Sequence, residues 1–254
     1  LHEVLLGSKS ASLPEPWARQ GVGTRGTTAP YALKQHQGGP CGLLAAVQAH
    51  LLRQLRLADV EHHLATPAVA TDALVRALAE IIWGCRVGRS ATVVVCSAQQ
   101  LPPAREAAES LASTECSSLD GVGATVRAAL GAFCRPHGPG VAMLLYSVLL
   151  TRGIAMVRRD ADFATSLILP NGYCAQELVN LLLFGRATSN VFDGERSTGG
   201  DDGARLRGVQ RTSPIGFLTL FERQGSLLRA ANAEGVESLV VVGRRLKHPV
   251  APIF

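Results

Sequence analysis

The strongest constraint on the fold is an apolar run of ten residues, 141–150, bounded by Gly140 and, after Thr151, by Arg152. A helix formed from this run has no polar face, so it must be covered by other parts of the protein on every side. The run is also shorter than the roughly 20 residues that a membrane-spanning helix needs. We therefore expect a buried helix here and no membrane span in the chain.

Other segments carry helical or extended patterns. Apolar residues recur at spacings of three and four in 41–56, and Pro40 suits the start of a helix because proline has no backbone N–H to leave unpaired. Thr71 as the cap and Gly84 as the stop predict a second helix over 72–83. The first 40 residues, rich in Gly, Pro, Ser and Thr, are predicted as loops and short extended pieces. Further helices are predicted at 102–112, 123–133 and 173–184, and strands at 92–96, 215–221 and 239–242.

Helices thus come first and strands late, an order typical of an α+β fold. A length of 254 residues is enough for one domain with a substantial core. Five Gly, three Asp and four Arg in 193–214 predict a mobile surface loop. The chain begins at Leu1 without a signal-peptide pattern and stops inside the apolar stretch 250–254. We expect it to be a piece of a longer protein.

Composition argues against two classes of function. The net charge is +5, but the arginines are scattered and aromatic residues are only 5%, so no basic stripe with stacking rings predicts nucleic-acid binding. The six cysteines form no Cys-x-x-Cys pair, so we expect no zinc site. Dispersed cysteines without an export signal favour a reducing compartment, the cytosol or the nucleus.

Residues 21–26 match the pattern G-x-G-x-x-G. A dinucleotide site needs this pattern between a strand and the start of a helix, where the helix N-terminus holds the pyrophosphate. Prolines and a tryptophan precede it here, and two threonines and a proline follow. We interpret it as a glycine-rich loop.

The segment 35–48 (QHQGGPCGLLAAVQ) carries more chemistry. It places Cys41 in the first turn of an apolar helix, where unpaired N–H groups stabilise a thiolate. Gln35 lies on the loop that leads into this helix, and its side-chain amide could donate to an oxyanion formed when Cys41 attacks a carbonyl. Cysteine hydrolases use this arrangement with a distant His as base. On these residues alone, a buried and inert Cys41 is an equally open interpretation.

The segment 35–48 resembles the nucleophile region of the MINDY deubiquitinases, in the branch with a G-G-P-C-G motif. Three more blocks resemble that branch in the same order: 16–21 (PWARQG), 172–192 (GYCAQELVNLLLFGRATSNVF) and 215–222 (IGFLTLFE). A G-G-P-C-G motif alone is a weak match, but four blocks in order make the resemblance specific.

The resemblance implies a papain-like α+β fold with one deubiquitinase catalytic domain over 1–254, incomplete at its C-terminus. It implies Cys41 as the nucleophile and Gln35 as the residue that stabilises the oxyanion, with no metal or cofactor. The implied activity is cysteine-type hydrolysis of isopeptide bonds in polyubiquitin, with a preference for lysine-48-linked chains. The partners would be ubiquitin and polyubiquitin, and we expect a monomer that binds neither nucleic acid nor membrane. In the block 173–192 we expect a structural helix whose polar residues hold neighbouring loops.

One family element has no match. The family's general base is a His in a late strand, and none of the seven histidines (2, 36, 50, 62, 63, 137 and 248) is a convincing equivalent. We expect the base to lie beyond this chain, so that 1–254 reacts with an activated ubiquitin probe but cleaves chains poorly. Two alternatives stay open: an inactive ubiquitin-binding relative, and a helical interaction domain in which Cys41 is merely packed.

Overall fold

The computed structural model describes residues 1–58, 64–101, 110–162, 164–192, 194–197, 205–209, 215–216 and 240–241. The expected apolar helix, α8 (Gly140–Arg152), lies in its core, and every residue of α8 except Leu150 is buried. This confirms the buried helix that the apolar run predicts.

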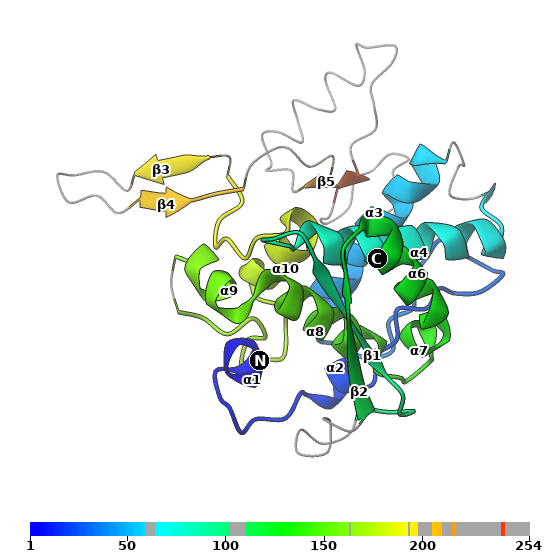
Figure 1. The fold of residues 1–254 in the computed structure, drawn as a ribbon, viewed down its shortest axis with the longest axis horizontal. Coiled ribbons are helices and arrows are strands. Elements are labelled where there is room, and N and C mark those ends of the chain that lie inside the picture. The colour runs from blue at the N-terminus through cyan, green and yellow to red at the C-terminus, as the bar shows by residue number, and fades with distance from the viewer. Residues whose placement is uncertain are drawn as a thin grey trace, which may run out of the picture.

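Two hydroxyl groups on α8 explain how a strand lies against it. Ser147 Oγ accepts a hydrogen bond from the backbone N–H of Val94, and Thr151 Oγ1 accepts one from that of Thr92, both at 2.8 Å. They attach the predicted strand, β1 (Ala91–Cys96), along α8. Figure 1 shows this strand running in front of the helix.

The other edge of β1 pairs antiparallel with β2 (Leu111–Cys116), from Ala91 opposite Cys116 to Cys96 opposite Leu111. The helix predicted over 102–112 is therefore wrong at its last two residues, because pairing with β1 outweighs their local helical preference. Residue 110 is helical as predicted, and 102–109 lie outside the described residues.

Three further predicted helices are present: α3 (Cys41–Leu57), α4 (Pro67–Gly84) and α10 (Gln176–Phe184). Helix α3 packs against both α4 and α10. Helix α10 starts at Gln176 rather than at residue 173, because the chain before it forms a turn in which the backbone N–H of Gly172 bonds to the carbonyl of Leu169. Gly185 ends α10, in the left-handed region at φ 72°.

Helix α4 begins earlier than predicted because a different threonine caps it. Thr66 Oγ1 accepts a hydrogen bond from the backbone N–H of Val69, and Pro67 occupies the first helical turn. Thr71, the cap predicted from sequence, lies inside the helix, where its hydroxyl donates to the carbonyl of Pro67 at 2.7 Å.

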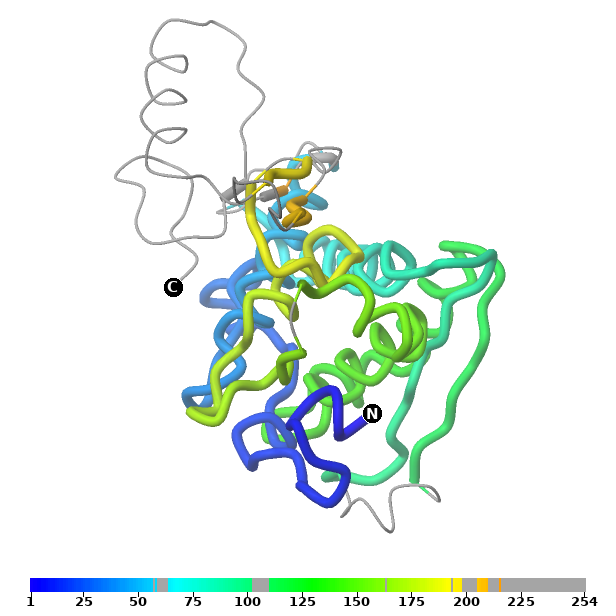
Figure 2. The backbone as a smooth tube through the Cα atoms, turned by 90° about the vertical axis from the view of Figure 1, so that its left-hand side faces the viewer, coloured from blue at the N-terminus to red at the C-terminus, as the bar shows by residue number. Residues whose placement is uncertain are grey.

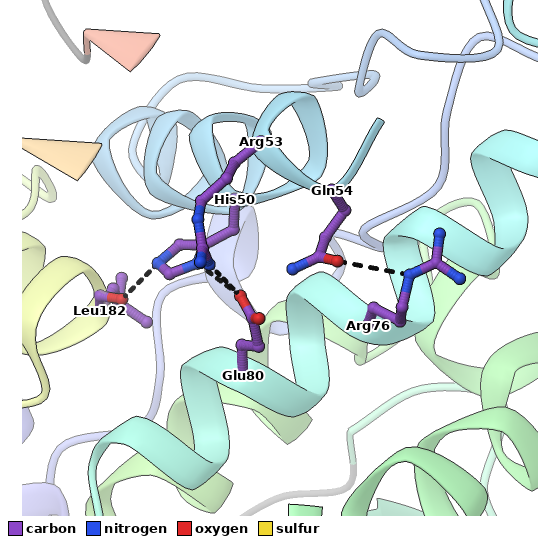
Figure 3. A network of polar contacts seen from close by, with 6 residues as sticks. All are labelled: His50, Arg53, Gln54, Arg76, Glu80 and Leu182. Atoms are coloured by element: carbon purple, nitrogen blue, oxygen red, sulfur yellow. Dashed lines mark hydrogen bonds and ion pairs between the residues drawn. The ribbon is translucent and has the colours of Figure 1, made fainter. Parts of the chain in front are cut away.

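A polar network joins α3, α4 and α10 (Figure 3). Arg53 Nη1 lies 2.6 Å from Glu80 Oε2, and His50 Nδ1 lies 3.8 Å from the same oxygen. His50 Nε2 donates to the carbonyl of Leu182 at 3.2 Å. Burial raises the pKa of the Glu80 carboxyl, but the nearby His50 imidazole and the charge of Arg53 outweigh burial and leave that pKa below its ordinary value. The network fixes the half of α3 that is distant from Cys41.

Two predictions for the remaining helices need correction. The first 40 residues, expected as loops and extended pieces, contain two short helices, α1 (His2–Leu6) and α2 (Glu15–Ala18). The single helix predicted over 123–133 is two, α6 (Leu119–Ala128) and α7 (Leu130–Cys134), with α6 capped by a serine side chain before its first turn. Helix α9 (Ile154–Asp160) follows α8 after a break at Gly153.

The segment expected to be a mobile loop, 193–214, contains an antiparallel strand pair, β3 (Glu195–Ser197) and β4 (Arg205–Arg207). Figure 2 places this pair and the first residues of the chain at opposite ends of the described structure. Strands β5 (Ile215–Gly216) and β6 (Val240–Val241) pair in parallel, and the rest of the strands predicted at 215–221 and 239–242 lies outside the described residues. The chain is thus a mixture of helices and small sheets, consistent with the predicted α+β class.

The glycine-rich loop 21–26 is a packing element. A Cβ atom on Gly21 would lie 2.3 Å from the carbonyl oxygen of Arg135, and one on Gly23 would lie 2.7 Å from that of Cys134. The backbone N–H of Val22 donates to the carbonyl of Phe133 at 2.9 Å. The glycines therefore allow two backbones to approach each other.

Within the described residues, no single helix is long and apolar enough to cross a membrane; α8 and α9 meet that criterion only as a pair bent by 84°.

Candidate active site

Cys41 is the first residue of α3 and is partly exposed. Its thiol lies 3.8 Å from the carbonyl oxygen of Gly39. The first N–H groups of a helix have no partner within it, and together with the helix dipole they stabilise an anion beside them. The predicted position of Cys41 at a helix start is confirmed.

The turn before Cys41 is fixed by two distant segments. Gly39 has φ 122°, and a Cβ atom there would lie 3.2 Å from both Trp17 Nε1 and the carbonyl oxygen of Gly172. Trp17 is fully buried, and its Nε1 donates to that same carbonyl at 2.8 Å. Glycine is favoured here because L side chains rarely adopt φ 122°, and a Cβ atom would also crowd this pair.

The residue after Cys41 is also in close contact. A Cβ atom on Gly42 would lie 3.0 Å from Cys174 Sγ and 3.1 Å from Val179 Cγ2. Burial raises the pKa of the Cys174 thiol to about 12, so this thiol remains protonated beside the nucleophile. The contact places the start of α3 directly against the segment that leads into α10.

The other cysteines are in unreactive settings. Burial raises the pKa of the Cys85 thiol to about 12 and that of Cys134 to about 11, and it also raises the pKa of Cys96. Cys116 is buried. Only Cys41 combines partial exposure with a position at the start of a long helix.

Gln35, the second predicted site residue, lies on the exposed loop before the turn. Its Nε2 donates to the carbonyl of Gln37 at 2.7 Å rather than to any group of Cys41. One of the two N–H groups of this amide is thus occupied by Gln37 in the structure.

The sequence interpretation missed two glutamines that hold this loop. Gln20 is buried, and its side chain bonds to Lys34 and to His36, on either side of Gln35. Gln48, on α3 itself, accepts a hydrogen bond from the backbone N–H of Leu33 at 2.8 Å. Both glutamines stand out in the sequence. Gln20 belongs to the 16–21 block, and Gln48 is a polar residue on an otherwise apolar stretch. Neither pattern indicates which groups these side chains bond to.

The structure brings none of the four described histidines into a hydrogen bond with Cys41. The rings of His36 and His137 lie 4.2 Å apart, and His137 has φ 54°, as expected of a turn residue. His50 lies nine residues along α3 from Cys41, about 13 Å at 1.5 Å per residue. His2 bonds to Ala11 and Tyr146. His62, His63 and His248 lie outside the described residues.

Among the residues that are described, no three His, Cys, Asp or Glu side chains are grouped so as to hold a metal ion.

Comparison with known proteins decides the family. The conserved domain of the deubiquitinating enzymes MINDY-3/4 matches residues 2–254. The chain belongs to the MINDY-3/4 deubiquitinase family. Probable ubiquitin carboxyl-terminal hydrolase MINDY-4 of Homo sapiens is 37% identical over 268 residues, which cover 99% of this chain and 33% of that protein.

Other MINDY proteins are similar. Probable ubiquitin carboxyl-terminal hydrolase MINDY-4 of Xenopus tropicalis is 34% identical over 269 residues, covering 100% of this chain and 34% of that protein. Ubiquitin carboxyl-terminal hydrolase MINDY-3 of Xenopus tropicalis is 30% identical over 236 residues, covering 79% of this chain and 53% of that protein. The chain thus spans about a third of the length of the MINDY-4 relatives. No solved structure matches it significantly.

The structure explains why three of the MINDY blocks occur together. Block 16–21 supplies Trp17, block 35–48 supplies Gly39 and Gly42, and block 172–192 supplies Gly172 and Cys174. Gly39 lies against Trp17 and Gly172 on one side of Cys41, and Gly42 lies against Cys174 on the other. Within the last block Asn180 Nδ2 donates to the carbonyls of residues 188 and 190, as expected of a residue that holds loops.

Proposed function

We propose that this chain is the catalytic part of a cysteine deubiquitinase on a papain-like fold, which hydrolyses isopeptide bonds in polyubiquitin, in particular lysine-48-linked chains. The observation that carries the proposal is the setting of Cys41, which is partly exposed at the start of a 17-residue helix. The MINDY-3 and MINDY-4 relatives are named ubiquitin carboxyl-terminal hydrolases, which supports the substrate class.

In this reaction the sulfur of Cys41 attacks the carbonyl carbon at the C-terminus of the distal ubiquitin, and the carbonyl oxygen becomes an oxyanion. The amide of Gln35 and backbone N–H groups near Cys41 donate to this oxyanion. When the intermediate collapses, the C–N bond breaks and the lysine amine leaves with a proton. Water then hydrolyses the thioester, which releases ubiquitin and restores the thiol.

The proton transfers need a general base that also acts as a general acid. Because none of the described histidines forms a hydrogen bond with Cys41, we assign this role to a His in a later strand, as the family resemblance implies. Such acid–base help is worth about 10²–10⁴-fold in rate. We further propose that the protein acts as a monomer in the cytosol or nucleus.

An inactive ubiquitin-binding relative is the second candidate. The observation that favours it is the Gln35 amide, which bonds to Gln37 and not toward Cys41. In that case the same surface would bind ubiquitin without cleaving it.

The two candidates separate in one experiment. The full-length protein and the 1–254 chain are each incubated with tetraubiquitin of different linkages, with Cys41→Ala as the matched control. A deubiquitinase cleaves lysine-48-linked chains in the full-length form, and Cys41→Ala abolishes cleavage. Ubiquitin binding by both forms without any cleavage would reject the enzyme proposal.

A further inference from the structure

We infer that Gln20 is a positioning residue for Gln35: its buried carboxamide fixes the backbone on both sides of Gln35 and so sets the direction from which the Gln35 amide can reach an oxyanion at Cys41. This inference rests on the proposed function and adds to it a residue outside the nucleophile segment.

The geometry of the clamp is specific. Gln20 is 1% exposed, and its Nε2 donates to the carbonyl of Lys34 at 2.9 Å, while its Oε1 accepts from the backbone N–H of His36 at 2.9 Å. The two partners are the peptide groups that flank Gln35. The Gln20 carboxamide thus bonds to the carbonyl before Gln35 and to the N–H after it, as the backbone of a neighbouring strand would.

The orientation of this carboxamide is fixed by its surroundings. Nε2 also donates to the carbonyl of Gly21 at 2.6 Å, so the nitrogen lies between two carbonyl oxygens. A flipped side chain would place its oxygen against both carbonyls and its nitrogen against the N–H of His36. Only one orientation therefore satisfies all three hydrogen bonds.

The base of the clamp is rigid. The carbonyl of Gln20 accepts a hydrogen bond at 2.8 Å from the backbone N–H of Val141, in the first turn of the buried helix α8. The loop is also held at Leu33 by Gln48, which lies on the same helix as Cys41. The backbone of Gln35 is therefore anchored to the core through one glutamine and is linked to the helix of the nucleophile through the other.

This rigidity matters because the Gln35 side chain itself is exposed and makes a single bond to Gln37. For an oxyanion donor, a displacement of about 1 Å can cost on the order of 10²-fold in rate. With the backbone fixed, only rotation of the Gln35 side chain remains to set where its amide points. Without the clamp, the whole residue can move.

The test compares Gln20→Met in the full-length protein with a matched change at another buried carboxamide. Asn180 is 0% exposed and donates to two backbone carbonyls, as Gln20 does, but it holds residues 188 and 190 rather than the loop of Gln35. We expect Gln20→Met to lower kcat for ubiquitin cleavage about 10–10²-fold with KM changed less than about twofold. Asn180→Leu should lower the melting temperature comparably and leave kcat unchanged.

Three further measurements separate positioning from general damage. The rate at which iodoacetamide alkylates Cys41 should be the same in wild type and Gln20→Met. In a Gln35→Ala background, Gln20→Met should reduce kcat less than about twofold, since no amide remains to be positioned. The His36 amide should exchange with solvent faster in Gln20→Met. If that variant does not fold, Gln20→Asn, which keeps the amide but is too short to reach both partners, takes its place.

The outcomes are distinct. Additive losses in the double variant, or an unchanged kcat, would overturn the positioning role. A fast-exchanging His36 amide in wild type would overturn the clamp itself. A full-length wild type that lacks turnover would instead overturn the proposed function, and with it the catalytic part of this inference.

Discussion

The sulfur of Cys174 lies against Gly42, the residue that follows the candidate nucleophile, so closely that a Cβ atom on Gly42 would lie 3.0 Å from it. Glycine at this position lets the start of α3 approach the segment before α10. The contact explains in physical terms why a glycine follows Cys41, even though glycine weakens a helix by about 0.5–1 kcal/mol relative to alanine.

Gly42→Ala is expected to destabilise the protein. The added methyl group must displace Cys174 and Val179, and overpacking of a filled site costs about 1–3 kcal/mol, more than the helix gains from alanine. Chemical unfolding measures the change. Gly131→Ala is the control, because a Cβ atom there meets no atom within 4 Å, and it should stabilise the protein or leave it unchanged. Equal stability of the two variants would contradict the close approach.

The parts of this fold that the sequence predicts are those with a strong local signal. The run that became α8 has no polar face, and the start of α3 combines proline, glycine and a regular apolar spacing. By contrast, Thr66 and Thr71 both precede helical patterns, and the structure uses Thr66 because α4 begins there with Pro67. Strand β2 is extended because it pairs with β1, which local preference does not reveal.

The site follows the same division. The position of Cys41 at a helix start follows from its neighbours in sequence. The family resemblance then implies the roles of both Cys41 and Gln35. The role of Gln20 depends on contacts with residues 14 and 16 positions further along the chain, for which no periodic pattern exists. The contact between Cys174 and Gly42 likewise joins segments that only the fold brings together.

Cys41 is expected to be the only cysteine modified by a ubiquitin probe with a C-terminal electrophile. Burial raises the pKa of the thiols of Cys85, Cys134 and Cys174, so they stay protonated at neutral pH, and a probe of this size does not reach buried sulfur. Peptide mapping by mass spectrometry locates the adduct. Cys41→Ser should remove it, and undiminished labelling of that variant would refute the assignment.

Gln35→Glu is expected to lower turnover of ubiquitin chains about 10²–10³-fold, the loss typical of one oxyanion donor. The carboxylate has nearly the same shape as the amide but repels a developing negative charge. Because the residue is exposed, its replacement should change the free energy of unfolding by less than about 0.5 kcal/mol. Steady-state kinetics of the full-length variant test this. Near-normal turnover would show that backbone N–H groups suffice.

The stability of the site should depend on pH through His36. Burial lowers the pKa of the His36 imidazole below its ordinary 6.5, and the nearby charges of His137 and Lys34 lower it further. Between the lowered pKa and 6.5, the unfolded chain binds the proton and the folded protein does not. The contribution of His36 to the free energy of unfolding is therefore fully present above pH 6.5. It is lost as the pH falls through the pKa that His36 has in the folded protein.

Replacing His137 tests this cause. His137→Asn removes one of the two positive charges, and asparagine tolerates φ 54° at this turn, so the fold should be kept. The pKa of His36 should then rise toward its ordinary value while remaining below it, because burial and Lys34 still act. NMR titration of the His36 ring protons measures the shift. Lys34→Arg preserves the second charge and should leave the pKa of His36 where it is in wild type. An unchanged titration curve in His137→Asn would show that the two rings do not interact electrostatically, despite their separation of 4.2 Å.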